Sequence, residues 1–220
     1  MTFSILARDP ASNAIGGAAA TGSLCVGGWV LRGDARVGMS ASQGMSPSTL
    51  WGEDVLAAMR GGQSAETAVA TVTGADRGRA QRQLAALGLT GPGVVFSGEE
   101  NLPEISGKPF DGGVAAGNML SGAGVIDAMV AHYLAARGDF ASRLLSSLRA
   151  AADAGGDTRG LLSASLLILS PDAAPLTLRV DYHEDPLAAL DALHARATSG
   201  DYATWSRQVP TLNDPERGVD

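Results

Sequence analysis

The order of the expected elements constrains the fold of this chain more than any other feature of its sequence. Alternating or short continuous apolar runs bounded by turn residues predict strands over 2–8, 14–23, 35–42, 81–89, 93–97, 112–118, 161–169 and 176–182. Helices are predicted from Pro47 to Gly61, after Ser64, over 122–136 and 139–152, and after Asp185. This grouping of strands with strands and helices with helices favours an antiparallel α+β arrangement over alternating βαβ units. Two sheets with small inward side chains, covered by helices on both outer faces, would satisfy it.

Two segments are predicted to lack regular structure. Residues 24–31 are apolar but irregular, and residues 98–111 form a loop rich in glycine, proline and acidic residues. The run IGGAAATGS over 15–23 consists of very small side chains, so it lets another layer or a ligand approach its backbone closely.

Composition favours one packed domain. Hydrophobic residues make up 45% of the 220 residues and charged residues 18%, which supports a sizeable core rather than disorder. We expect a single domain over residues 1–200 and a polar C-terminal tail over 201–220, with Trp205 as its anchor.

Charge and targeting signals argue against several classes of partner. The net charge is −7, Lys108 is the single lysine, and no basic cluster or aromatic platform indicates a nucleic-acid partner. No apolar run reaches about 18 residues and no signal peptide opens the chain, so no membrane partner is expected. A single cysteine, Cys25, fits the reducing cytoplasm.

The chain reads as a strand from its start, TFSILARD over residues 2–9, with Thr2 directly behind Met1. If Met1 is removed, Thr2 carries a hydroxyl nucleophile together with its own base, a free α-amine with a pKa of about 7.7–8.0. The alternative interpretation is that Thr2 merely begins an edge or core strand. What distinguishes the two interpretations is whether the peptide bond between Met1 and Thr2 is cleaved.

Two further segments carry groups that could serve such a nucleophile. In the strand-to-helix passage SASQG over 40–44, the Gly44 N–H could hold a developing oxyanion, while Ser42 and Gln43 could orient substrate or water. Asn118 ends a strand of small residues, where its side-chain amide could donate to an oxyanion or bind a substrate carbonyl. Each segment also reads as turn chemistry at the end of a strand.

Two arginines are candidate substrate ligands. Arg82 lies in an otherwise apolar strand and Arg159 in a glycine-rich loop, and either could clamp a carboxylate with two hydrogen bonds. Either could equally pair with an acidic residue of the chain, such as Asp157 or Asp111.

Metal and cofactor signatures are missing from the sequence. Cys25 has no histidine near it in sequence and is expected to behave as a small apolar residue. The three histidines are far apart, and neither metal-ligand spacing nor a phosphate-binding glycine loop occurs. We therefore expect no metal site and no cofactor.

Seven segments occur in an order that resembles a known family. They are TFSILARDP, GGAAATGSLCVGG, RVGMSASQG, PSTLWG, RQLAALGL, GGVAAGNMLSG and AGGDTRG. Together they resemble the bacterial domain of unknown function 1028 family, which is placed with the N-terminal nucleophile (Ntn) hydrolases. The resemblance covers roughly residues 2–200. It implies the four-layer αββα sandwich of that superfamily, an α+β fold of two mostly antiparallel sheets.

The resemblance also implies an activity and an assembly. Proteasome-type members place a lysine beside the nucleophile, where this chain offers only Arg32 or Arg36. Relatives often carry a polar residue after the GGDxRG loop, where this chain has Leu161 and Leu162, so that part of a pocket is expected to be more apolar. Because the superfamily often oligomerises, a homodimer or larger homo-oligomer is expected.

The leading hypothesis is a cytoplasmic hydrolase that cleaves a C–N amide bond of a small molecule or short peptide. Thr2 attacks after Met1 removal, its amine serves as base, and the Gly44 N–H with Asn118 stabilises the oxyanion. Arg82 or Arg159 binds an acidic group of the substrate. The alternative is a non-catalytic protein on the same fold that retains Met1 and uses its small-residue cleft for ligand binding or oligomer contacts.

Overall fold

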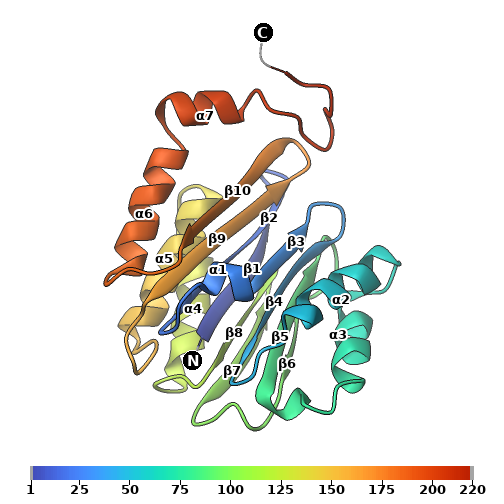
Figure 1. Ribbon diagram of the computed structural model, residues 1–220, viewed down its shortest axis with the longest axis vertical. Coiled ribbons are helices and arrows are strands. Elements are labelled where there is room, and N and C mark those ends of the chain that lie inside the picture. Colours follow the sequence, from blue (N-terminus) through green and yellow to red (C-terminus); the bar gives the residue numbers. More distant parts are fainter. Residues whose placement is uncertain (1, 219–220) are drawn as a thin grey trace.

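The computed structural model describes residues 2–218; Met1 and residues 219–220 lie outside them, and with them the question of Met1 retention. Within this range two antiparallel sheets form, as Figure 1 shows. The larger has the order β10-β9-β2-β1-β8-β7 and the smaller β3-β4-β5-β6. The strands are β1 (Thr2–Asp9), β2 (Ala14–Thr21), β3 (Leu31–Asp34), β4 (Gly38–Gly44), β5 (Arg82–Gly88), β6 (Val94–Ser97), β7 (Ile105–Phe110), β8 (Gly113–Asn118), β9 (Ser163–Ser170) and β10 (Ala173–Val180).

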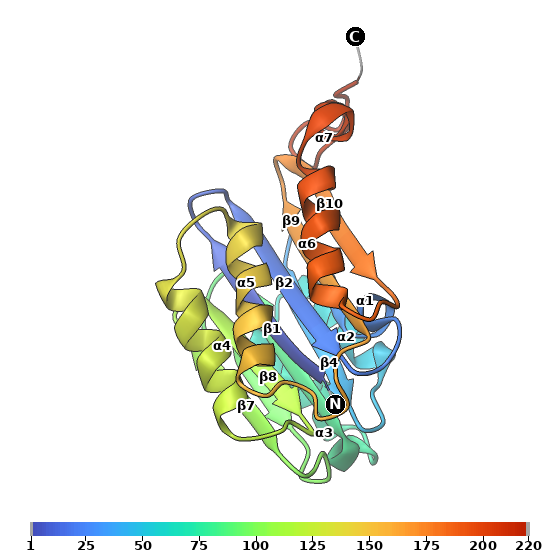
Figure 2. The same cartoon turned by 90° about the vertical axis from the view of Figure 1, so that its left-hand side faces the viewer.

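Helices cover the outer faces of both sheets. They are α1 (Val26–Trp29), α2 (Thr49–Arg60), α3 (Ala65–Gly74), α4 (Gly124–Ala135), α5 (Phe140–Asp153), α6 (Pro186–Ala197) and α7 (Gly200–Ser206), with a 3₁₀ turn at Arg79–Gln81. Helices α4, α5 and α6 pack on the six-stranded sheet, and α2 and α3 pack on the four-stranded sheet (Figures 1 and 2). The antiparallel α+β arrangement of two sheets between helices is thereby confirmed.

The helix starts follow local sequence chemistry. The side chains of Ser64, Asp139 and Asp185 each accept a hydrogen bond from a backbone N–H in the first turn of α3, α5 and α6. These bonds satisfy amide groups that a helix leaves without internal partners. The three predicted N-caps are confirmed.

The first two strands form the predicted hairpin, and β1 lies inside the larger sheet between β2 and β8. Small residues in β2 are required by close packing. A Cβ on Gly16 would lie 2.9 Å from the Phe140 side chain of α5, and one on Gly17 would lie 2.6 Å from the side chain of Leu6. The run of tiny side chains therefore brings a helix and a neighbouring strand close to the backbone of β2.

Alternation along β1 divides its side chains between two environments. Phe3, Ile5 and Ala7 are buried against the helices. Ser4 and Leu6 point into the space between the sheets, where Ser4 bonds to β4 and Leu6 joins an apolar cluster. Because successive residues of a strand point to opposite faces, Thr2 shares the inner face with Ser4 and Leu6.

The structure corrects two expectations. The segment 98–111, predicted to be a loop, contains the edge strand β7. None of its side chains is fully buried, so it lacks the hydrophobic periodicity that marks a half-buried strand. Residues 24–31, predicted to be irregular, contain the helix α1 and the start of β3. In addition, the first residues of the segment expected as a polar tail form most of the helix α7. Trp205, the expected anchor of that tail, is half exposed.

Candidate functional site

A pocket of about 410 Å³ lies where the start of β1 meets the end of β4. Thr2 lines it and is only 8% exposed, so this residue forms part of the buried floor of the pocket. The other lining residues come from the end of β2, from α1, from the segment after β4, and from two loops: Thr21, Ser23, Leu24, Val26, Trp29, Val30, Gln43, Gly44, Met45, Pro47, Met119 and Arg159. The pocket volume is in the range of small-molecule sites.

Thr2 is held by strand pairing on both sides. It lies opposite Thr21 of β2 and opposite Asn118 of β8. The Thr2 hydroxyl donates to the Thr21 hydroxyl over 3.1 Å, and Thr21 Oγ1 also accepts from the Ser23 N–H at 3.3 Å. The predicted site residues Thr2 and Asn118 are therefore neighbours, and their position is fixed by the hydrogen-bonded core of the sheet.

A buried chain of amides supports this end of the two sheets. Gln43 accepts from the Ser4 hydroxyl at 2.8 Å and donates to Gln83 Oε1 at 2.7 Å. Gln43 also reaches the Thr2 carbonyl oxygen, at 3.4 Å. Gln83 donates in turn to Ser97 Oγ and to the Gly117 carbonyl. Gln43 therefore bridges the two sheets directly beneath Thr2.

Asn118 is fully buried and joins the same network at one atom only. Its Nδ2 donates to Gln83 Oε1 at 3.4 Å, while Oδ1 has no hydrogen-bond partner among residues 2–218. The amide N–H is thus directed towards Gln83, and Asn118 is not among the residues that line the pocket. A buried acceptor without a donor is costly, so it is a feature that calls for a ligand or a changed neighbour.

Gly44 brings a backbone N–H to the pocket. The Ser42 N–H donates to the Val30 carbonyl on the β3 side of β4, and strand alternation directs the Gly44 N–H to the same side. Gly44 has φ +142°, and a Cβ there would lie 2.5 Å from the Gln81 carbonyl oxygen. The Ser42 side chain is used elsewhere, because its hydroxyl donates to the Ser48 carbonyl at 2.7 Å.

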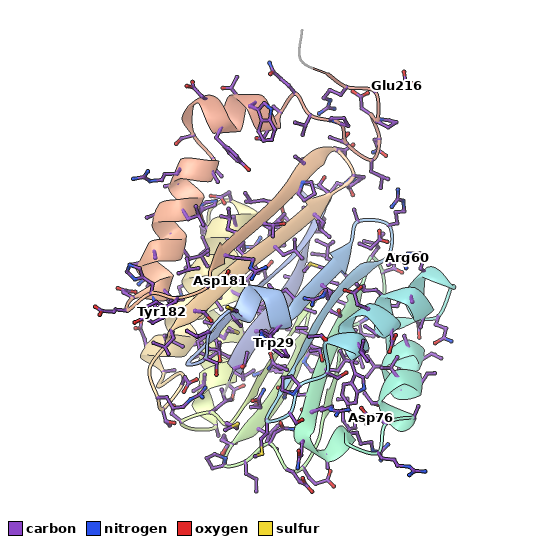
Figure 3. The ribbon with its side chains drawn as sticks, in the orientation of Figure 1. Trp29, Arg60, Asp76, Asp181, Tyr182 and Glu216 are labelled. Atoms are coloured by element: carbon purple, nitrogen blue, oxygen red, sulfur yellow. The ribbon has the colours of Figure 1, made fainter. Side chains whose placement is uncertain are left out.

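Arg82 does not reach this pocket. Its guanidinium pairs with Asp76, donates from Nε to the Ser46 carbonyl at 2.9 Å, and lies over the Trp51 ring. Figure 3 shows Asp76 near the end of α3 and Trp29 on α1, apart from each other in this view. The alternative that the sequence left open for Arg82, pairing with an acidic residue of the chain, is the one that the structure contains.

Arg159 does line the pocket, but its guanidinium is engaged by Asp157. Arg159 donates from Nε to Asp157 Oδ1 at 3.1 Å and from Nη2 to Oδ2 at 2.9 Å. The Gly22 N–H donates to the same carboxylate at 2.6 Å. Burial alone would raise the pKa of Asp157, but the hydrogen bonds from Arg159 and Gly22 outweigh it and lower the pKa below its usual range. The pair therefore stays ionised at neutral pH.

The remaining residues considered from the sequence lie outside the pocket lining. Arg32 pairs with Glu53 and Arg36 with Asp34, so neither takes the position of a lysine beside Thr2. Leu161 packs against the core under the helices. Neither Leu161 nor Leu162 lines the pocket, so the expectation that they make it more apolar is not met.

Sequence reasoning missed Thr21 and Gln83 as parts of the site. It named Asp157 only as an alternative partner of Arg159, which is the pairing that the structure contains. The hairpin register contains the signal for Thr21, because a turn centred on residues 11–12 places residue 21 opposite residue 2. No comparable signal marks Gln83, which reads as an isolated polar residue in an apolar strand. Its role follows from the packing of one sheet on the other.

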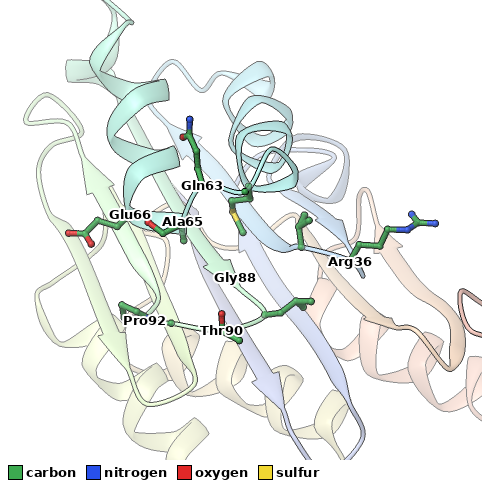
Figure 4. A pocket seen from close by; sticks show the side chains of 13 residues that line it. Arg36, Gln63, Ala65, Glu66, Gly88, Thr90 and Pro92 are labelled. Carbon is green, nitrogen blue, oxygen red and sulfur yellow. The ribbon is translucent and has the colours of Figure 1, made fainter.

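A second pocket, of about 340 Å³, lies at the opposite end of β4 and β5 (Figure 4). Arg36 and Glu66 extend outward on opposite sides of it. The Ser64 hydroxyl in its wall is used as the N-cap of α3, where it accepts from the Thr67 N–H at 3.1 Å. This arrangement brings no nucleophile and acceptor together, so the pocket around Thr2 is the candidate site.

Within residues 2–218, no group of three or more histidine, cysteine, aspartate or glutamate side chains could hold a metal ion. In the same range, no helix has both the length and the apolar character needed to cross a membrane.

The fold and the site together define a mixed α/β protein in which two antiparallel sheets, covered by helices, hold a threonine at the floor of a pocket. Residues 2–190 match the sequence model of the family described as "Family of unknown function (DUF1028)", and the chain belongs to that family. The crystal structure of protein SPO2555 from Silicibacter pomeroyi, assigned to the same family, is 55% identical in sequence. It superposes with a TM-score of 0.96, over 100% of this chain and 96% of that one. No curated protein matches the chain.

Proposed function

We propose that this protein is an Ntn-type amidohydrolase that cleaves a C–N amide bond of a small molecule or short peptide. The observation that carries the proposal is the position of Thr2, a hydroxyl residue directly behind Met1, at the floor of a pocket. The order of layers, helices on sheet on sheet on helices, agrees with the αββα sandwich of that superfamily.

The chemistry depends on removal of Met1. The residues that line the pocket include no histidine, lysine or acidic side chain among residues 2–218, so the lining offers the Thr2 hydroxyl no side-chain base. A freed α-amine on Thr2 would supply that base at a pKa near neutrality. The Arg8 N–H donates to the Gly112 carbonyl, so strand alternation directs the main-chain nitrogen of Thr2 towards β8 and Asn118.

The proposed reaction has two steps. In the first, Thr2 Oγ1 attacks the amide carbonyl, its proton passes through the α-amine to the leaving nitrogen, and the C–N bond breaks to leave an ester on Thr2. In the second, water attacks the ester, releases a carboxylic acid and restores the hydroxyl. The Gly44 N–H stabilises the oxyanion in both steps.

The geometry favours a different role for Asn118 than the oxyanion donor expected from the sequence. Its N–H is directed to Gln83, whereas its buried Oδ1 has no partner among the described residues. We assign Oδ1 as an acceptor that orients the α-ammonium of Thr2 once Met1 is gone.

The first test measures amide hydrolysis by protein that begins at Thr2 and by variants of the Thr2 side chain. Protein that begins at Thr2 is expected to hydrolyse members of a small-amide library, and Thr2→Ala to lower turnover by at least about a thousandfold. Thr2→Ser keeps the nucleophile and is expected to retain measurable turnover. Thr90→Ala, at an exposed threonine distant from the pocket, is the matched control.

A non-catalytic binding protein on the same fold is the second candidate, favoured by the lack of a side-chain base in the pocket lining. Intact-protein mass spectrometry of protein from its native host separates the two. Stoichiometric retention of Met1 would exclude the Thr2 mechanism, as would unchanged turnover in Thr2→Ala. The homo-oligomer and the cytoplasmic location stay predictions from the sequence.

A further inference from the structure

The rim of the Thr2 pocket is formed by large apolar side chains that face solvent. Leu24 is 54% exposed, Trp29 50% and Met45 49%, and all three line the pocket. Large apolar side chains exposed in one contiguous patch indicate a binding surface more often than scattered ones do. Figure 3 shows Trp29 on the short helix α1, in front of the sheets.

The segment that carries Leu24 and Trp29 is fixed to the sheet. The Cys25 N–H donates to the Asp181 carbonyl at 3.0 Å, and the Val26 N–H donates to Ser163 Oγ at 3.1 Å. Ser163 Oγ donates in turn to the Ser23 carbonyl at 2.7 Å. Trp29 is therefore exposed on a segment whose backbone is held in place by hydrogen bonds.

Met45, the third rim residue, is fixed in the same way. The Met45 N–H donates to Asn101 Oδ1 at 2.8 Å, and Asn101, which is fully buried, donates from Nδ2 to the Gly98 carbonyl at 3.0 Å. Met45 follows directly on Gly44, whose N–H is the proposed oxyanion donor. An apolar group seated against Met45 would thus lie next to the reacting carbonyl.

The side chains that line the pocket carry almost no net charge. Arg159 is the one charged side chain among the described residues that line it, and two hydrogen bonds join it to the ionised Asp157. A substrate carboxylate would have to compete with Asp157 for the guanidinium. Arg159 is thereby ill-suited to the carboxylate clamp considered from the sequence.

We propose that the pocket selects amides whose acyl group is uncharged and apolar, an aliphatic or aromatic chain seated between Trp29 and Met45. This deepens the proposed function and rests on it for turnover, whereas the ligand preference does not depend on turnover. The volume of about 410 Å³ suits a small acyl group rather than a folded protein.

The test compares two six-carbon amides that differ at the far end of the chain, hexanamide and the monoamide of adipic acid, which carries a carboxylate there. Binding is measured by calorimetry on the Thr2→Ala protein, which cannot turn either ligand over. Hexanamide is expected to bind at least about tenfold more tightly, because the carboxylate of the other ligand would lose hydration in a pocket whose one charged side chain is already paired. Equal or reversed affinities would overturn the proposal.

Substitutions locate the binding surface. Trp29→Ala is expected to weaken hexanamide binding about tenfold, and Trp29→Phe to restore most of it. The matched control is Trp205→Ala, at a tryptophan on α7 that is 51% exposed but outside the pocket lining. An equal loss in both variants, or in neither, would reject Trp29 as the contact.

A third arm tests the neutral charge. Asp157→Asn leaves Arg159 without its anionic partner, so binding of the adipic monoamide is expected to increase while hexanamide binding changes little. If the carboxylated ligand already binds well with Asp157 in place, Arg159 is available and the proposal fails. Sizing at the same concentrations adds a further check, because a dimer that Trp29→Ala dissociates would show that a second copy covers the rim instead.

The outcomes keep the two proposals apart. Preference for hexanamide without hydrolysis of any amide would remove the enzymatic function and leave an apolar ligand site. Hydrolysis with preference for carboxylated acyl groups would keep the enzyme and remove this inference.

Discussion

The two ends of the space between the sheets differ in chemistry although they share the same three strands. On the inner faces of β4 and β5, the paired residues run from Met39 and Leu87 at one end to Gln43 and Gln83 at the other. In β1, Leu6 belongs to the apolar end and Ser4 to the polar end. The side chains at both ends are fully or almost fully buried.

The two ends therefore have different roles: the apolar end holds the two sheets together, and the polar end fixes their relative position. The apolar end holds the sheets together by burying surface, which has no preferred direction. The polar end is joined by directional hydrogen bonds, and it is the end at which Thr2 lies. Satisfied buried amides fix relative positions more narrowly than apolar contacts do, because any displacement leaves a donor or acceptor unpaired.

The largest effect is expected at the apolar end. Leu87→Ala removes a fully buried side chain between the sheets and is expected to lower the free energy of unfolding by about 2–5 kcal/mol. Urea denaturation followed by circular dichroism measures it. Leu89→Ala, two residues further on and exposed, is expected to change stability by less than about 0.5 kcal/mol. A small loss for Leu87→Ala would show that this end does not hold the sheets together.

At the polar end, Gln83→Leu should cost somewhat less. The change keeps the approximate size but removes the acceptor of the Gln43 amide N–H and the side-chain donor to the Gly117 carbonyl. We expect a loss of about 1–3 kcal/mol in the same denaturation assay. Gln63→Leu, at an exposed glutamine, is the control. If Gln83→Leu stabilises the protein, the amide chain serves position alone and contributes nothing to stability.

The Asp157–Arg159 pair beside the pocket is expected to make stability depend on pH. Because the folded pKa of Asp157 lies below the ordinary value of about 3.9, its contribution is present above that value and is lost as pH falls through the folded pKa. Asp157→Asn should therefore be less stable than the parent at pH 7, with a difference that closes below about pH 4. Asp153→Asn, at an exposed aspartate four residues earlier, should show no such convergence.

The smallest stability effect at the polar end is expected for Asn118→Ala. Its hydrogen bond to Gln83 is long, at 3.4 Å, and Oδ1 has no partner among residues 2–218, so the loss should be about 1 kcal/mol or less. Turnover by protein that begins at Thr2 should fall much further, with a shifted pH profile, because the α-amine loses its acceptor. A fall in turnover no larger than the loss of folded protein explains, with an unchanged pH profile, would assign Asn118 a structural role only.

Much of the fold could be predicted from the sequence because its signals are local. The β1–β2 hairpin, the N-caps at Ser64 and Asp139 and the grouping of strands and helices all follow from residues close together in the chain. β7 could not be predicted, because an exposed edge strand lacks the hydrophobic alternation that marks a half-buried one.

The candidate site was predictable only in part. The placement of Thr2 beside Asn118, with Gln43 and Gly44 close by, agrees with the residues singled out from the sequence. Arg82, expected from the sequence as a substrate ligand, lies outside the pocket lining, and its contacts with Asp76 and the Trp51 ring form only through the packing of helices on the smaller sheet.

By itself the sequence determined most of the helices and strands, and it placed a hydroxyl residue at the start of the first strand. Only the tertiary structure decided what surrounds that hydroxyl. Gln43 links Thr2 to Gln83 because two sheets pack face to face, and Asp157 lies beside the pocket because its distant loop is bonded to Gly22. Local propensity is encoded over a few residues, whereas the neutral charge of the pocket and its apolar rim depend on contacts that form only when the whole core does.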